Sequence, residues 1–215
     1  MTTDPGPAMT SVAPMTPAAP MTARQEARRR RILQATARLA GRGGFDAVQM
    51  REVAESSGVA LGTLYRYFPS KVHLLVAVMQ DQLEDLHETL RKRPPTDEDP
   101  AARVARTLMR AFRAMQREPH LADAMVRALT FADRSVSAEV ETVSRLTTAI
   151  ILDAMGPAGS RPTALQLSAV RVIEHTWHSA LITWLSGRAS IAQVATDIET
   201  ACRLIDPAGA VRRQE

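Results

Sequence analysis

The spacing of the apolar residues is the feature that most constrains the fold. Apolar side chains recur every three or four positions over most of the chain, and no stretch alternates apolar with polar residues for long. This spacing places apolar side chains on one face of an α-helix, whereas strands alternate. Only 4% of the 215 residues are aromatic, so the core must be built mainly from Ala, Leu, Val, Ile and Met. We therefore expect an all-α protein with about nine helices.

Composition divides the chain into three parts. Residues 1–23 contain five prolines and little that can be buried, which predicts a disordered N-terminal tail. Residues 24–93 are expected to form an N-terminal domain of three helices followed by a long helix, and residues 94–215 a second helical domain. The boundary falls in a polar segment that contains prolines. Asp99 before Pro100 is a favourable helix start just beyond it.

Positive charge is concentrated in one part of the chain. Residues 24–71 contain ten Lys and Arg against four Asp and Glu, whereas residues 94–215 contain 14 of each. A local basic excess is typical of proteins that bind nucleic acid. An ordinary solvated basic face explains it as well, and the same two interpretations remain open for Arg28–Arg31, as phosphate contacts or as solvated surface.

Several classes of protein are not expected. Cys202 is the only cysteine, so no intrachain disulfide can form, which suits a reducing compartment. No apolar run reaches the roughly 18 residues that span a membrane, and the N-terminus has no secretory pattern. The five histidines lack a cysteine pair or a carboxylate cluster nearby, and no serine lies in a nucleophile-elbow context. We expect a cytoplasmic protein with no metal, no cofactor, no membrane association and no enzymatic activity.

The segment after the first helix predicts a helix–turn–helix. A short helix over Met50–Ser56 is followed by a tight turn at Gly58 and a second short helix from about Leu61. Leu64 and Phe68 anchor this second helix in the core. In such a unit the second helix enters the major groove of DNA.

Polar residues around these helices are candidates for DNA contact. Gly62 lets the backbone approach DNA closely, because it has no side chain. Arg51 and Arg66 have the reach and the bidentate geometry to bind guanine. Four further side chains can donate hydrogen bonds to phosphate oxygens, which fix position without reading sequence: Thr63, Tyr65, Tyr67 and Lys71.

The segment from Phe45 to Leu75, FDAVQMREVAESSGVALGTLYRYFPSKVHLL, resembles the DNA-binding domain of TetR-family transcriptional regulators. The stretch GTLYRYFPSK is its specific part. The resemblance implies that Arg51, Leu61 and Arg66 can face bases, with Leu61 against a thymine methyl or only excluding water. Gln49 stands where the family often has Thr at the start of a helix. Because Gln is a poor helix cap, it is a further candidate for DNA contact.

The family resemblance also implies how such a protein works. It implies a homodimeric repressor that binds a palindromic double-stranded operator and is released by a small ligand. Shorter matches, VQMREVA, GVALGTLYRYFPSKVHLLV, AMQREP and FAD, resemble the actinobacterial subgroup that represses cholesterol catabolism. This subgroup implies a lipophilic, sterol-derived effector such as a coenzyme A thioester. Five arginines could meet its phosphates or simply keep the surface soluble: Arg103, Arg106, Arg110, Arg113 and Arg117.

The second domain offers a candidate pocket and a candidate interface. Apolar side chains with several methionines could enclose a ligand, although ordinary core explains each of them too: Met109, Phe112, Met115, Met125, Leu129, Phe131, Trp177, Leu181 and Trp184. The last two helices carry apolar stripes, which indicates a partner. The resemblance implies a four-helix dimer interface there, formed by Val170, Ile173, Ile191, Val194, Ile198 and Ile205.

Two alternatives remain open at this point. One is a TetR-type repressor of another lipid or xenobiotic pathway. The other is an architectural DNA-binding protein that responds to no ligand. The second alternative predicts a filled core in the C-terminal half and weak sequence preference.

Overall fold

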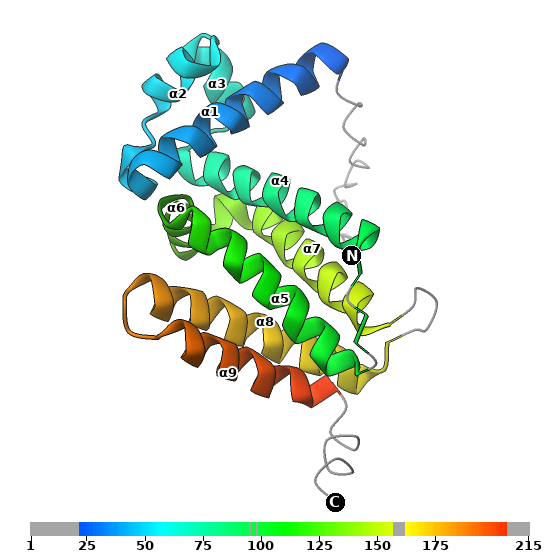
Figure 1. Cartoon of the computed structure of the whole chain (residues 1–215). Coiled ribbons are helices and arrows are strands. Elements are labelled where there is room, and N and C mark those ends of the chain that lie inside the picture. The colour runs from blue at the N-terminus through cyan, green and yellow to red at the C-terminus, as the bar shows by residue number, and fades with distance from the viewer. Residues whose placement is uncertain (1–21, 95, 98, 157–161, 206–215) are drawn as a thin grey trace, which may run out of the picture.

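The computed structural model describes residues 22–94, 96–97, 99–156 and 162–205, and it confirms the all-α fold. Across these residues there are nine α-helices, two short 3-10 helices and no strand (Figure 1). The helices are α1 Ala23–Ala47, α2 Met50–Ser57, α3 Leu61–Tyr67, α4 Lys71–Lys92, α5 Pro100–Arg117, α6 Pro119–Thr130, α7 Ser137–Met155, α8 Ala164–Leu185 and α9 Ile191–Cys202. The 3-10 helices are η1 Arg134–Val136 and η2 Arg203–Ile205.

Helix α4 lies between the two ends of the molecule. Helices α1 to α3 form one end, and α8 and α9 form the opposite end (Figure 1). Helix α4 packs against α1 on one side and against α6 and α7 on the other. Helix α1 also makes an extensive contact with α6. The proposed domain boundary after residue 93 therefore stays a prediction, because α4 contributes to both halves.

Side-chain caps begin two of the helices, at Ser70 and at the predicted start Asp99. The Ser70 hydroxyl accepts a hydrogen bond from the His73 backbone N–H, and the Asp99 carboxylate accepts one from the Ala101 N–H. Both side chains satisfy backbone donors that a helix start leaves free. Thr22 caps α1, which begins at Ala23, the last residue of the range predicted as a tail. The rest of that prediction lies outside the described residues.

Helix α1 bends near its C-terminal end. Gly43 and Gly44 have non-helical backbone angles, and Gly44 has a φ of 69°. A Cβ atom on Gly44 would lie 2.9 Å from Asp123 Oδ2 of α6. Gly44 is thus favoured by its left-handed backbone, and a side chain there would also displace the Asp123 carboxylate.

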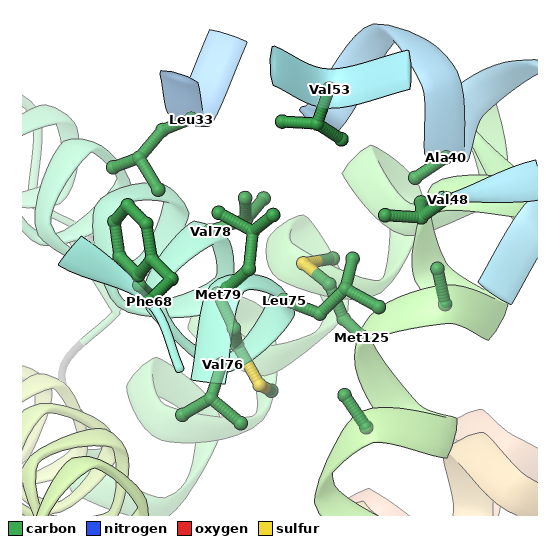
Figure 2. Close-up of a cluster of buried hydrophobic side chains, with 14 of the residues drawn as sticks. Leu33, Ala40, Val48, Val53, Phe68, Leu75, Val76, Val78, Met79 and Met125 are labelled. Carbon is green, nitrogen blue, oxygen red and sulfur yellow. The ribbon is translucent and has the colours of Figure 1, made fainter. Parts of the chain in front are cut away.

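A first core joins helices α1 to α4 to α6. Leu64, Leu75 and Val53 are fully buried in it. Figure 2 shows that side chains of the DNA-binding half converge with Met79 of α4 and Met125 of α6. Burying a side chain such as leucine stabilises a fold by about 1.5–3 kcal/mol. The helix–turn–helix is therefore held by the same apolar packing that anchors α6.

A second core lies between α5, α8 and α9. Phe112 is its centre, with its ring 4.9 Å from that of Trp184 and 6.4 Å from that of Trp177, both edge-to-face. Such aromatic pairs add about 0.5–1.5 kcal/mol each beyond burial. The second core thus ties the last two helices to α5.

This core corrects the predicted dimer interface. Five of the six residues are at most 5% exposed within the single chain, so they have no surface to offer a partner: Val170, Ile173, Val194, Ile198 and Ile205. The prediction is wrong for these five, because an apolar stripe on a helix marks burial without saying against what. Ile191 is 54% exposed and remains available.

Two kinds of feature are absent from the described part of the chain. No helix there has both the length and the apolar character needed to cross a membrane. In those same residues, no group of three or more His, Cys, Asp or Glu side chains is arranged to hold a metal ion.

The second core makes a testable prediction about Cys202. Its side chain is buried, and burial raises the pKa of the thiol to about 12, with a smaller effect from the Glu199 charge. Because the thiolate is the reactive form, we expect no reaction with Ellman's reagent at pH 8 in the folded protein. Guanidinium should release the single thiol for full reaction, which the absorbance change measures. Fast reaction without denaturant would contradict this packing of α9.

Candidate functional site

The turn between α2 and α3 has the geometry of a helix–turn–helix. Gly58 ends α2 in the left-handed region, with a φ of 66°, which glycine adopts without strain. Its N–H donates to the Glu55 carbonyl at 3.1 Å, and the Val59 N–H donates to the Ala54 carbonyl at 3.0 Å. These bonds close the end of α2 and turn the chain into α3.

Helix α3 separates its anchors from its candidate DNA contacts. Leu64 is fully buried and Phe68 is 5% exposed, as expected for anchors. Tyr65 is 46% exposed, an unusual value for a large aromatic side chain, and Arg66 is exposed beside it. The remaining candidates of the helix lie half-buried at the edge of this face: Leu61, Thr63 and Tyr67.

Arginines on both short helices are free for an outside partner. Arg51 of α2 and Arg66 of α3 are exposed. Neither makes a hydrogen bond or an ion pair with any described residue of the chain. Both guanidinium groups therefore keep all of their donors for a ligand such as a base edge or a phosphate.

Gly62 occupies open space on α3. A Cβ atom at this position would meet no atom of the protein within 4 Å, and the backbone is helical. Glycine destabilises a helix relative to alanine, so the fold itself gives no reason for it. A close approach by a partner from outside remains as the physical reason for a glycine here.

Gln49 and Lys71 have partners inside the chain. Gln49 makes no cap to α2, as expected, and its amide donates to the Asp46 carbonyl at 3.0 Å. Lys71 is half-buried: its Nζ donates to the Phe45 carbonyl at 3.1 Å and lies 4.2 Å from the centre of the Phe45 ring. An ammonium group has three donors, so a phosphate contact by Lys71 would have to use the remaining ones.

A cavity of about 670 Å³ lies below the DNA-binding half. It is bounded by α4, α5, α6, α7 and α8, and most of its surface is apolar. Cavities of about 300–1,000 Å³ are typical of binding sites for small molecules. The apolar residues at its wall are Met79, Leu83, Leu86, Ala111, Ala114, Met115, Leu121, Ala122, Met125, Val126, Leu129, Val140, Val143, Trp177 and Leu181.

The structure separates the nine predicted pocket residues into two groups. Five line the cavity: Met115, Met125, Leu129, Trp177 and Leu181. Four do not, namely Met109, Phe112, Phe131 and Trp184. The reasons are physical: Phe112, Trp184 and Met109 pack in the second core, whereas Phe131 is 54% exposed and packs on Phe45 of α1. The α4 wall was missed, because the apolar stripe of α4 had been assigned to the helix–turn–helix alone.

The α7–α8 side of the cavity is polar. Glu174 is half-buried, and the Thr148 hydroxyl donates a hydrogen bond to its Oε1. Burial raises the pKa of Glu174 although this hydrogen bond opposes the shift. Burial lowers the pKa of His178, one helical turn further on, and the charge of His175 acts in the same direction. The spacing of His175 and His178 along one helix was the only sequence signal for this patch.

Most of the five arginines are engaged away from the cavity. Arg103 donates to the Ala154 and Asp97 carbonyls, Arg106 pairs with Asp97 at 2.5 Å, and Arg110 donates to the Arg93 carbonyl. These three hold the segment between α4 and α5. Arg117 lines the cavity, and Arg113 is exposed on the same helix.

A cluster that the sequence did not predict joins α1 to α6. We call it the junction cluster; it consists of Phe45, Asp46, Lys71, Arg127 and Phe131. Arg127 pairs with Asp46 at 2.9 Å and lies 5.0 Å from the Phe45 ring, whose centre is 5.3 Å from that of Phe131. Helix α6 therefore touches the cavity on one face and the end of α1 on the other.

Two family models match the chain. Residues 32–78 match the one described as "Bacterial regulatory proteins, tetR family". Residues 97–205 match the one described as "Tetracyclin repressor-like, C-terminal domain". The first match contains the helix–turn–helix, and the second contains most of the cavity wall.

Characterised proteins agree with these matches. The chain is 46% identical over 181 residues to the HTH-type transcriptional repressor KstR of Rhodococcus jostii, covering 84% of each chain. It is 42% identical over 197 residues to KstR of Mycolicibacterium smegmatis, covering 92% of this chain and 96% of that protein. A crystal structure of a TetR transcriptional regulator from Rhodococcus sp. RHA1 superposes with a TM-score of 0.79 at 39% identity, covering 86% of this chain and 98% of that one. The chain belongs to the TetR family of bacterial transcriptional regulators.

Proposed function

We propose that this regulator represses genes of steroid degradation, and that a lipophilic effector in the cavity releases it from DNA. The observation that carries the proposal is the position of α4 and α6 between the exposed face of α3 and the cavity. The sequence identity between this chain and two repressors called KstR supports the regulatory role. The assignment to steroids rests on the subgroup resemblance of the motifs around α3. A repressor of chromosomal genes would act in the cytoplasm.

The surface for DNA would be the outer face of α2 and α3. Arg51 and Arg66 would face bases, and Tyr65 with its exposed hydroxyl would hold a phosphate. Thr63 and Tyr67 would add phosphate contacts at the edge of this face.

The cavity would suit the apolar part of a lipophilic effector. Its wall is mainly apolar, and methionines such as Met79, Met115 and Met125 adapt to irregular shapes. If the effector is a coenzyme A thioester, its phosphates would lie outside, near Arg113 and Arg117. The presence of a cavity disfavours an architectural protein without a ligand, because that alternative predicts a filled core.

A dimer would use the exposed face of α8. Leu165 is 62% and Val172 45% exposed, and the two lie seven positions apart on one side of the helix. Thr176 and Ser179 continue this face with small side chains. Ile191 at the start of α9 adds a further exposed apolar group. Helix α8 lies at the end of the molecule opposite α1 to α3 (Figure 1). Two recognition helices would then bind a palindromic operator about one helical turn apart.

Release would follow from differential binding. An effector lowers operator affinity only if it binds the conformation that does not fit the operator more tightly. Helices α4 and α6 both line the cavity, and both pack on the DNA-binding half. A shift of either helix would therefore change the spacing of the two recognition helices in the dimer.

One experiment tests the proposed function directly. DNA fragments selected by the purified protein would be sequenced and mapped to the genome of the source organism. Sites upstream of steroid-degradation genes support the proposal. Strong sites elsewhere would refute the steroid assignment and favour another pathway, and the absence of any sequence preference would favour the architectural alternative.

Gly62→Ala should stabilise the fold and at the same time weaken DNA binding. The open space around Gly62 predicts that alanine stabilises the fold by about 0.4–1 kcal/mol, measured by urea unfolding. The added methyl would meet an approaching DNA backbone, so operator affinity should fall about tenfold, which is about 1.4 kcal/mol. Fluorescence anisotropy with a labelled operator measures this affinity.

Gly41→Ala is the matched control, because Gly41 also has open space but lies in α1. Unchanged operator affinity of the Gly62 variant would contradict the proposed contact.

Val172→Glu should dissociate the dimer. A buried, unpaired carboxylate is strongly unfavourable, so the dimer dissociation constant should rise more than about tenfold. Sedimentation velocity over a concentration series measures this. Ala138→Glu, on the exposed surface of α7, is the control and should leave the association state unchanged. If the Val172 variant dimerises like the parent protein, the interface lies elsewhere.

Arg127→Ala should weaken the response to the effector more than it weakens the fold. Its ion pairs are solvent-exposed and contribute about 0–1 kcal/mol to stability. Loss of the junction cluster should nevertheless reduce the factor by which saturating cholestenoyl coenzyme A weakens operator binding, which typically corresponds to about 1–3 kcal/mol of coupling. Anisotropy titrations with and without this probe measure that factor. Arg134→Ala, an exposed arginine of η1, is the control. A full response in the Arg127 variant would show that the effector does not act on operator binding through the junction cluster.

A further inference from the structure

One part of the cavity wall combines a carboxyl group with two imidazole rings. Ser144 and Thr147 of α7 face Glu174, His175 and His178 of α8 across the contact between these helices. The walls formed by α5 and α6 are largely apolar. An effector that fills the cavity therefore meets hydrogen-bonding groups along α7 and α8, and further ones on α4 at Gln82, Asp85 and Thr89.

Glu174 is held in place but is only partly satisfied. The Thr148 hydroxyl donates to Oε1, while Oε2 has no hydrogen-bond partner among the described residues. Thr148 thus positions the carboxyl group of Glu174, and this residue lines the cavity. A half-buried carboxyl oxygen without a partner is costly, and a ligand group that hydrogen-bonds to it removes that cost.

His178 supplies the complementary group. It lies four positions after Glu174, so the two side chains project from the same face of α8. Its ring makes no hydrogen bond with any described residue. Burial lowers the pKa of the ring, so it is neutral at neutral pH and carries one N–H donor and one acceptor nitrogen. Glu174 and His178 together can both accept and donate.

This pair selects for an uncharged oxygen. A hydroxyl can donate to Glu174 and accept from His178, and a ketone can accept from His178. A carboxylate or phosphate would bring a second negative charge against Glu174 in a poorly solvated place, which is unfavourable. A purely hydrocarbon group would leave Glu174 Oε2 and the His178 ring without hydrogen-bond partners.

We propose that Glu174 and His178 bind an uncharged oxygen of the effector, an alcohol or a ketone, and that Thr148 positions Glu174 for this contact. This inference rests on the proposed function, in which the cavity holds a lipophilic effector. It adds the orientation of that effector: its neutral polar end lies against α8, and any acidic or coenzyme A end lies elsewhere.

Three sterol probes that differ only around one ring test the proposal. They are cholesterol with an alcohol, cholest-4-en-3-one with a ketone, and 5α-cholestane with no oxygen, each delivered from cyclodextrin. Binding is followed by tryptophan fluorescence, because Trp177 lines the cavity. We expect the parent protein to bind at least one oxygenated probe about tenfold or more tightly than cholestane.

Two substitutions assign the contacts. His178→Phe should remove the advantage of the ketone, and Glu174→Gln should reduce the advantage of the alcohol. The decisive quantity is the ratio of oxygenated to hydrocarbon affinity, because general damage to the cavity weakens all three probes alike. Glu141→Gln, on the exposed side of α7, is the matched control and should keep the parent ratio. A preference for cholesterol identifies the bound oxygen as an alcohol, and a preference for the enone identifies it as a ketone.

The outcomes distinguish this inference from the proposed function. If the parent protein binds all three probes equally, or if both variants keep the parent ratio, the polar anchor is refuted while a lipophilic cavity stands. If the parent protein binds none of the probes, the steroid effector itself is refuted, and the anchor with it.

Discussion

The packing of α4 and α6 against one another is the interaction on which the rest of the structure depends. Each helix faces the cavity with some of its side chains and the core of the DNA-binding half with others. Met79 and Met125 belong to both environments (Figure 2). Protein interiors are close-packed, so neither helix can move toward the cavity without disturbing the core that carries α2 and α3. Two sites with different chemistry thereby share one set of apolar contacts.

The junction cluster sets how α1 and α6 lie against each other within this shared packing. The ion pair between Arg127 and Asp46 is exposed, so it contributes little to stability, but it fixes which part of α1 lies over α6. Gly44 lies beside this contact, where a side chain would displace the Asp123 carboxylate of α6. At the other end of the same core, the His73 Nε2 donates to the Ser135 carbonyl at 3.2 Å and ties the start of α4 to the segment after α6. Weak polar contacts thus set the geometry, and apolar burial supplies the stability.

The parts of this structure that follow from local sequence were the ones that could be predicted. A helix cap such as Ser70 or Asp99 acts on a backbone group two or three residues away, so its effect is visible in the sequence. The cavity depends on five helices from distant parts of the chain. Periodicity reports that Phe112 and Val170 are buried, but it cannot report that they face the second core rather than a ligand or a partner. Phe131 shows the converse, since its aromatic ring lies exposed against Phe45.

The charges at the cavity limit which part of an effector can act on α4 and α6. Asp85, Glu118 and Glu174 line the cavity, whereas Arg117 is the single cation among its described lining residues. A ligand with several negative charges would be repelled from this interior and would keep those charges in water, beside Arg117 at most. Its apolar body would then be the part in contact with the helices that carry the signal. Differences in the shape of that body, rather than in the charged group attached to it, would decide whether operator affinity changes.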